Sequence, residues 1–502
     1  NNSSIQAGIT EIGTGNINSL GRSDITIDAT AKNKVSHFSG SLAVGMVSGN
    51  VSVVVGTLSS DVGVTIGDNT NLNADGTISI KALSTRPSDA DSLSATAIEM
   101  GGGLFGVNAG TVVSKISSEA VVTIGQGVDI SGIYRDRALA INIDASREDR
   151  VTTKIENALV SLAVGVGSTI AIAKNEGLAE VRIGDAATAS SLRGDTVTIQ
   201  VQDKTRTTVE AFSAAGGLLG TGNGVDADAQ NNGRANLILT RTGINASSLN
   251  MNNIASGIAS ADARGVTVAG GVAIGVSLAK AKLSTSMTTT ISNGGYGDAQ
   301  ISADTVNIVT ELNNSNGTSN NVTSFAKSSG GGLLSGNGAS AKAYLDYTVA
   351  TVISGNIFGA TSVDIATNAN APKASAKGEG KSGGVAVIGV TSAVAGQSAG
   401  KTATVSTTYE QGNLDSFGTI TVQTNNAPFM KSTVESGTGG LLVGSGGVAD
   451  VNVRVSSQTS LGTLGILNVT TPGELNIGAG SLPKVASLLD NTSGSLIGAS
   501  GA

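Results

Sequence analysis

A strand-like signature that returns along the whole chain constrains the fold more than any other feature of this sequence. It has the form apolar–polar–apolar, as in ITIDA or INIDA, and its copies begin near residues 25, 78, 141, 197, 249, 306, 363 and 420. A unit of about 57 residues with few large apolar groups cannot bury enough surface alone, so it must stack on its neighbours. The sequence therefore predicts one continuous β-repeat array over residues 25–469. Residues 1–24 are interpreted as the end of a preceding repeat and 470–502 as a tail or partial repeat.

The units are of two alternating kinds, distinguished by a glycine-rich apolar centre 20 to 30 residues after each start. The odd units read SLAVG (41–45), SLAVG (161–165), GVAIG (271–275) and GVAVIG (384–389). The even units read GGLFG (102–106), GGLLG (216–220), GGLLSG (331–336) and GGLLVG (439–444). Because the two kinds alternate strictly, the true repeat is a pair of units.

The segments on either side of these centres alternate with period two, which is the pattern of a strand. In the fifth unit, every second residue from Ala261 to Ala281 is Ala, Gly, Ser or Thr, and the other face carries larger residues such as Val268 and Ile274. We interpret the small-residue face in two ways. It avoids crowding in a narrow core, or it forms a dry sheet-to-sheet contact within or between chains.

These patterns favour an all-β repetitive β-solenoid, or parallel β-helix, of eight units. Helical solenoids disagree with the period and with the Gly and Val content. Blades and sandwiches need more aromatic residues than the 7 Phe, 5 Tyr and 0 Trp present. We expect two or three rungs of roughly 20–28 residues per unit. Corners are expected at turn pairs, namely Asp75-Gly76, Asn223-Gly224, Gly294-Gly295 and Asn337-Gly338. The alternative is a stack of long β-hairpins that bend near the glycine-rich centres.

Composition excludes several kinds of functional site. With 0 Cys and 1 His the chain offers no disulfide, no thiolate metal site and no histidine-based triad. A net charge of −7 without basic clusters argues against nucleic acid. The most apolar stretch, Val266–Ala281, is shorter than the ~20 residues that a transmembrane helix needs. The sequence therefore predicts no catalytic residue, no cofactor, no metal, no nucleic-acid partner and no membrane-spanning segment.

Three groups of charged residues are candidates for a site that this prediction would miss. Asp226-Ala227-Asp228 after Gly222-Asn223-Gly224 is faintly similar to a calcium-binding nonapeptide, but we interpret it as a solvated turn. Asp89 and Asp91 are interpreted as surface loop residues. The cluster Arg135–Arg137 and Arg147–Arg150 surrounds an insertion at Ile133–Arg137, where a solenoid could bind or cleave a glycan. We interpret this cluster as an exposed loop of mixed charge.

The recurring GGLLGxGNG and SLAVG/GVAIG centres with Ala/Ser/Thr-rich flanks resemble the repeat regions of large bacterial surface proteins, the leukotoxin-type filamentous adhesins related in style to filamentous haemagglutinin. The resemblance covers most of residues 25–455. It implies a β-helical stalk, an exported protein and a place at the cell surface. The secretion domain of that family has no counterpart in this sequence, and no family catalytic residue can be transferred to it.

The function expected from these observations is non-enzymatic: an extracellular or cell-surface structural repeat that forms a fibre or an adhesin stalk. The resemblance implies that the protein is bacterial. Expected partners are further copies of the chain, end to end or laterally, or a host surface or extracellular matrix. A carbohydrate- or calcium-binding adhesion module is the alternative, and a polysaccharide-active β-helix enzyme is a third. Because the chain starts at Asn1 without Met, we expect a segment or processed product of a longer protein.

Overall fold

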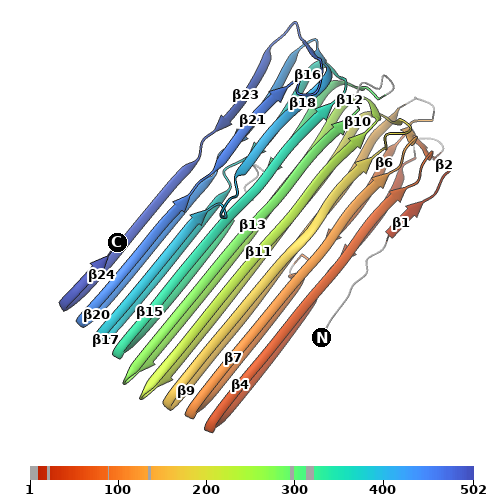
Figure 1. Cartoon of the computed structure of the whole chain (residues 1–502). Coiled ribbons are helices and arrows are strands. Elements are labelled where there is room, and N and C mark those ends of the chain that lie inside the picture. The colour runs from red at the N-terminus through yellow and green to blue at the C-terminus, as the bar shows by residue number, and fades with distance from the viewer. Residues whose placement is uncertain are drawn as a thin grey trace.

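The chain forms a β-solenoid, which confirms the fold class expected from the repeat. The structure is a computed structural model that describes residues 9–19, 23–88, 90–133, 137–293, 299–312 and 321–501. Strands make up 86% of the chain, and the described residues include no helix. Each strand pairing among them is parallel and joins one repeat to the next. Figure 1 shows the long strands lying side by side, in chain order from the first repeat to the last.

Each repeat makes one rung, so the expectation of two or three short rungs per unit was wrong. Glu210 lies opposite Asp262, 52 residues later, and Leu93 lies opposite Val151, 58 residues later. The rung is long because its period-two segments continue for more than twenty residues without a corner. At ~3.3 Å per residue such an arm is roughly 80 Å long, whereas each added rung advances the stack by only ~4.8 Å.

A rung has three parts, which the fourth repeat illustrates. An outgoing arm runs to Gly217, the chain bends at Leu218 and Leu219, and a return arm runs from Gly220 to Thr240. A short third side then starts at Thr242, where the next strand begins. The bend at the glycine-rich centre is what the hairpin alternative anticipated. The described pairings, however, join each arm to the same arm of the neighbouring rung, so the two arms belong to two sheets that face each other.

The strand bounds follow this path. Strands that pass through a bend are β4 (Val35–Ile66), β7 (Leu93–Ile124), β9 (Ala138–Ile183), β15 (Asn321–Ser354), β17 (Lys373–Gly396), β20 (Phe429–Asn452) and β24 (Lys484–Gly501). Two rungs are divided at the bend into β10 (Ser190–Gly217) with β11 (Gly220–Thr240), and β12 (Thr242–Ala269) with β13 (Val272–Ser292). The start of an outgoing arm is a separate strand in β3 (Ile25–Lys32), β6 (Thr77–Thr85), β14 (Ile301–Leu312), β16 (Ile357–Ala369), β19 (Thr419–Asn426) and β23 (Leu475–Ser481).

The remaining strands complete the wide end of the solenoid. The short third side includes β2 (Asn16–Ser19), β5 (Asn71–Ala74), β8 (Asp129–Ser131) and β22 (Leu467–Thr470). The ends of return arms include β1 (Ile9–Ile12), β18 (Ala403–Ser416) and β21 (Val455–Leu461). Strands β1 and β2 stack on β4 and β5 ahead of the first repeat, and β23 and β24 stack on β19 and β20 as a ninth rung. We number the rungs one to nine from the arms that begin near residues 25, 78, 141, 197, 249, 306, 363, 420 and 475.

The core tapers from the base, where three sides enclose it, to the bends, where only two sheets meet. In rung five the inward residues change from Leu249 and Met251 at the base to Ala259 and Ala261, and then to Thr267 near the bend, all buried. The small-residue face therefore lies inside the chain between its two sheets, which agrees with both interpretations, a narrow core and a sheet-to-sheet contact within the chain. Each large aliphatic side chain buried at the base, such as Leu249, contributes about 1.5–3 kcal/mol of apolar burial.

Inward threonines form a chain of hydrogen bonds that crosses rungs five to eight. Neighbouring hydroxyls lie 2.7–2.8 Å apart. The members alternate between the two sheets: Thr289, Thr310, Thr351, Thr367, Thr407, Thr424 and Thr459. A hydroxyl can donate once and accept twice, so neighbouring threonines satisfy one another inside the core.

Two of the expected corner pairs are wrong, because they lie inside strands. Asn223 and Asn337 point inward, and the Asn223 Nδ2 donates to the carbonyl of Ser213 at 2.7 Å. This bond to a distant backbone group replaces the local bond that would have formed a turn. Asp75-Gly76 does lie at a corner, between β5 and β6. Gly294-Gly295 lies outside the described residues.

Candidate functional site

The charged cluster predicted around the insertion is divided by the period of its strand. Arg147 and Asp149 point into the core and are buried, whereas Glu148 and Arg150 point outward from the same stretch of β9. On the surface, Arg86 pairs with Glu148 at 3.0 Å and Arg150 pairs with Asp91 at 2.8 Å. The interpretation of an exposed loop was therefore wrong for Arg147 and Asp149, because alternate residues of a strand face opposite sides.

The inward members form a buried ion cluster between rungs two and four. Arg147 lies opposite Asp203 of the next rung, and its Nε is 2.8 Å from Asp203 Oδ1 and 3.6 Å from Asp149 Oδ2. The Asp149 carboxylate also accepts hydrogen bonds from the hydroxyls of Ser92, at 3.3 Å, and Ser118. The cluster thus connects the two sheets across three rungs.

Burial controls the electrostatics of this cluster. It raises the pKa of the Asp149 carboxyl and of the Asp203 carboxyl, and the charge of Arg147 lowers both without cancelling the effect of burial. One guanidinium cannot fully compensate two carboxylates that have lost their water. Glycines on the opposite arm provide the space: a Cβ on Gly177 would lie 1.6 Å from Arg147 Nη1, and one on Gly233 would lie 2.1 Å from Asp203 Oδ2. With these side chains enclosed, the cluster is suited to hold the sheets together and not to meet a substrate.

The other sequence candidates are placed as follows. Asp226 and Asp228 point outward in the middle of β11, so the prediction of a turn was wrong, and Asp228 lies 3.5 Å from Lys280 Nζ. Burial, and then the charge of Asp228, raise the pKa of Asp226. Among the described residues, no group of three or more His, Asp or Glu side chains could hold a metal ion. Asp89, Tyr134, Arg135 and Asp136 lie outside the described residues, so the insertion itself is not placed.

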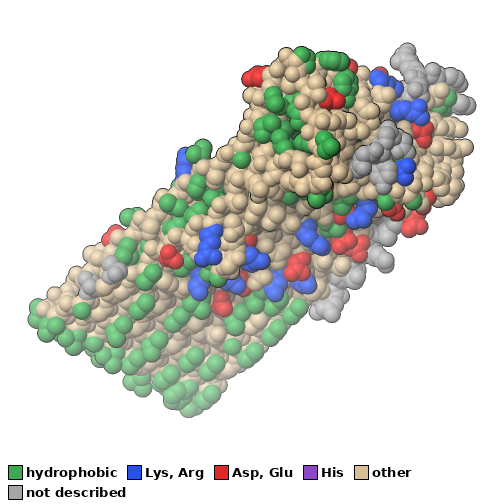
Figure 2. Space-filling model, turned by 45° about the horizontal axis from the view of Figure 1, so that its top comes forward, with side chains coloured by type: hydrophobic (Ala, Val, Ile, Leu, Met, Phe, Trp, Pro, Cys, Tyr) green, Lys and Arg blue, Asp and Glu red, His purple; other side chains and the backbone are tan. Residues whose placement is uncertain are grey.

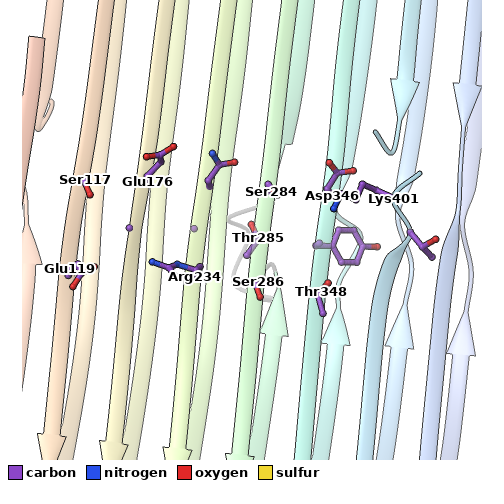
Figure 3. A pocket seen from close by; sticks show the side chains of 15 residues that line it. Ser117, Glu119, Glu176, Arg234, Ser284, Thr285, Ser286, Asp346, Thr348 and Lys401 are labelled. Atoms are coloured by element: carbon purple, nitrogen blue, oxygen red, sulfur yellow. The ribbon is translucent and has the colours of Figure 1, made fainter. Parts of the chain in front are cut away.

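A shallow groove on the outer face of the return sheet is the best candidate for binding a ligand. It encloses about 480 Å³ and crosses the strands along the stacking direction. Figure 3 shows the side chains that line it on successive rungs. Those with charge are Glu119 on β7, Glu176 on β9, Arg234 on β11, Asp346 on β15, and Lys401 before β18.

The groove is polar and open, and two of its acidic side chains form ion pairs with neighbouring lysines. Glu176 pairs with Lys115 at 3.2 Å, and Asp346 pairs with Lys282 at 3.2 Å. Arg234 is exposed and forms no ion pair with a described residue. Tyr347 is the one aromatic residue among those that line the groove, but its side chain is buried and its hydroxyl donates a hydrogen bond to Asn426 Oδ1 at 2.5 Å. The groove therefore offers charges and hydroxyls to an extended polar ligand, without an aromatic ring for a sugar to stack on.

Reasoning from the sequence missed the buried ion cluster and the groove. A signal for the cluster was present in the alternation of the strands. Arg147, Asp149 and Asp203 fall on the same face of their strands as the buried apolar residues Ile143 and Val201. The groove had no such signal, since its lining residues from different rungs are 50 or more residues apart and meet only through the rung length.

Comparison with known proteins adds no relative. No family model, no curated protein and no solved structure matches this chain. In the part of the chain that the structure describes, no helix is long and apolar enough to cross a membrane.

Proposed function

We propose that this chain is a non-enzymatic structural repeat that acts at a cell surface or outside the cell, as a segment of a fibre or an adhesin stalk. The observation that supports the proposal is the continuous parallel ladder, in which each described rung pairs with the next along both arms. Backbone hydrogen bonds of this kind are independent of side-chain identity, so the same rung can be repeated many times.

Two further observations favour a structural role. The charged residues nearest to a catalytic cluster, Arg147 and Asp149, are closed inside the core as an ion cluster. The rung is also broad, because ~57 residues add only ~4.8 Å along the stacking axis. The repeat therefore forms wide sheet faces and a short stack. A wide face offers surface for contact with other copies or with a host surface.

Electron microscopy and fibre diffraction of the purified protein test this proposal. We expect slabs whose long dimension is the arm, roughly 80 Å, and stacks with a meridional reflection near ~4.8 Å. Release of reducing ends from a polysaccharide, lost in a Glu176→Gln variant and kept in a Glu148→Gln variant, would contradict the proposal and favour an enzyme. Glu148 is a suitable control because it lies outward on β9 but outside the groove.

The groove favours a second candidate function, the binding of a polar polymer such as an acidic glycan. Arg234 is the exposed cation at its centre, with Lys401 further along the stack. A glycan array followed by calorimetry would test this candidate. Arg234→Ala should abolish binding, whereas Arg206→Ala, on the outgoing arm and outside the groove, should leave it unchanged.

A further inference from the structure

The bends of the rungs bring exposed apolar side chains together along one edge of the solenoid. We name this the apolar edge and define it as the bends of rungs one to nine with the outer faces of about five residues on either side. Its central members are pairs at successive bends, such as Leu218 with Leu219, Leu333 with Leu334, and Leu441 with Leu442, each more than half exposed. Figure 2 shows hydrophobic side chains gathered at the end of the molecule opposite its charged part.

Charge is nearly absent from the apolar edge. Among its described residues, Lys381 is the one charged side chain on the outer surface. Glu99 also falls within this region of sequence, but it is turned inward and is buried. This outer surface, with one charged side chain among its described residues, contrasts with the base, where charged residues are common (Figure 2).

A row of charged residues marks the boundary of the apolar edge on the outgoing sheet. Glu156, Arg264, Lys327, Glu379 and Glu435 share one register position, six or seven residues before their bends. Ion pairs cross the rungs here, with Lys327 at 3.4 Å from Glu379. On the return sheet the outward lysines Lys280 and Lys342 lie about nine residues after the bends, and Lys115 and Lys174 lie about eleven residues after them. The outer face of the outgoing sheet therefore becomes charged nearer to the bends than the row of lysines on the return sheet.

The apolar residues cover three sides, which decides between kinds of partner. Val160 and Val268 lie on the outer face of the outgoing sheet, Leu219 lies at the bend, and Ile274 and Val390 lie on the outer face of the return sheet, all exposed. A second copy stacked on one face would leave the other face and the bends in water. A surrounding apolar phase covers all three sides at once.

The depth of the apolar edge fits one leaflet of a lipid bilayer. Five strand residues span ~17 Å, compared with ~15 Å for half of a bilayer's hydrocarbon core. Backbone groups in lipid must be paired, and the inner rungs pair theirs with both neighbours, as β9 does with β7 and β10. Lysine and arginine at the boundary can place their charges at the headgroups while their methylene stems stay in apolar surroundings.

We propose that the apolar edge inserts into a lipid surface from one side, to the depth of the charged row, without spanning the bilayer. The inference goes beyond the structural role proposed above and does not depend on it. The ligand is the hydrocarbon layer itself, so uncharged phosphatidylcholine vesicles are the appropriate probe.

Vesicle flotation of the full chain tests the proposal. The tip variant is Leu218→Glu, Leu219→Glu, Leu333→Glu and Leu334→Glu, at positions exposed in the fold. Each leucine contributes more than a factor of 10 to transfer into hydrocarbon, so we expect the vesicle partition coefficient to fall at least ~100-fold. The matched control places four glutamates at equally exposed apolar positions of the base, Leu139, Phe417, Leu464 and Ile466, and should bind vesicles like the wild type.

Depth is measured with a single tryptophan, which is unambiguous because the chain has 0 Trp. Leu219→Trp should shift its emission to the blue on addition of vesicles and should be quenched by lipids brominated on the acyl chain. Leu139→Trp, at the base, should show neither effect. Circular dichroism of each variant verifies that the fold is kept.

Three results would overturn the proposal. The first is equal vesicle binding by the tip variant and the wild type. The second is the same emission of Leu219→Trp with and without vesicles. The third is a dimer in analytical ultracentrifugation that the tip variant dissociates, combined with no vesicle binding, which would assign the edge to a second copy of the chain.

Discussion

Replacing Arg147 by methionine should destabilise this solenoid strongly, because it removes the cation from an enclosed cluster of two carboxylates. Methionine keeps much of the volume of the side chain, so the main change is electrostatic. Arg147 is fully buried, and Asp149 and Asp203 are almost so. Breaking a buried ion pair by removing one partner costs about 3–5 kcal/mol, since the remaining charge is left without compensation. We expect a loss of this size in the free energy of unfolding at neutral pH.

The pH dependence gives this prediction a second signature. Burial raises the pKa of Asp149 and Asp203 above the ordinary value of 3.8, so the folded protein binds these protons more tightly than the unfolded chain does. Their contribution to stability is therefore full below pH 3.8 and is lost as the pH rises through the raised pKa values. Without Arg147 these pKa values rise further, so the destabilisation by Arg147→Met should be larger at neutral pH than at pH 4.

Equilibrium urea unfolding followed by circular dichroism, at several pH values, measures both effects. The matched control is Arg150→Met, three residues further on the same strand, where the ion pair with Asp91 is partly exposed. A surface pair of this kind contributes about 0–1 kcal/mol. Adding Asp149→Asn and Asp203→Asn to Arg147→Met should restore most of the stability. Equal effects of the two arginine substitutions, or an Arg147→Met effect that is the same at all pH values, would refute the reasoning.

Three further predictions concern the packing between the sheets. Gly177→Ala should destabilise the fold by about 1–3 kcal/mol and lower the melting temperature accordingly, because the new Cβ would overlap Arg147 Nη1 and the Ser118 carbonyl. The control Gly222→Ala should leave the melting temperature unchanged, because nothing lies within 4 Å of its Cβ. Thr367→Val should cost about 1–3 kcal/mol by interrupting the hydroxyl chain, and Thr367→Ser should cost less; equal losses in urea unfolding would contradict a role for the hydroxyl. Tyr347→Phe leaves Asn426 Oδ1 without this donor, so we expect slower unfolding in the wild type than in the variant, and identical unfolding rates would refute that expectation.

Much of the fold could be predicted from the sequence, because its strongest signals are local. The period-two pattern of Ala261–Ala281 requires a strand, and the recurrence of the unit requires stacking. The size of a rung could not be predicted in this way. Asn223-Gly224 has the composition of a turn, and only the inward hydrogen bond of Asn223 to Ser213 shows that the chain continues straight through it.

The candidate site could be predicted less well than the fold. Glu119, Glu176 and Arg234 come from three separate rungs, and their proximity depends on a register that local sequence does not specify. The insertion at Ile133–Arg137 was the natural place to look for a site, and its central residues lie outside the described residues. The expectation of an adhesin-like surface role remains a prediction.

The sequence by itself determined that the chain is a stack of like units, that its strands have one face of small residues, and that two kinds of unit alternate. These properties are set by neighbouring residues along a strand. The tertiary structure alone decided that one unit is one rung, that the small residues face inward, and that Arg147 and Asp203 meet in the core. It also decided that leucines such as Leu219 and Leu334, more than a hundred residues apart, line one exposed edge. The physical reason is that each of these features depends on the register between rungs, which is fixed when the whole core packs.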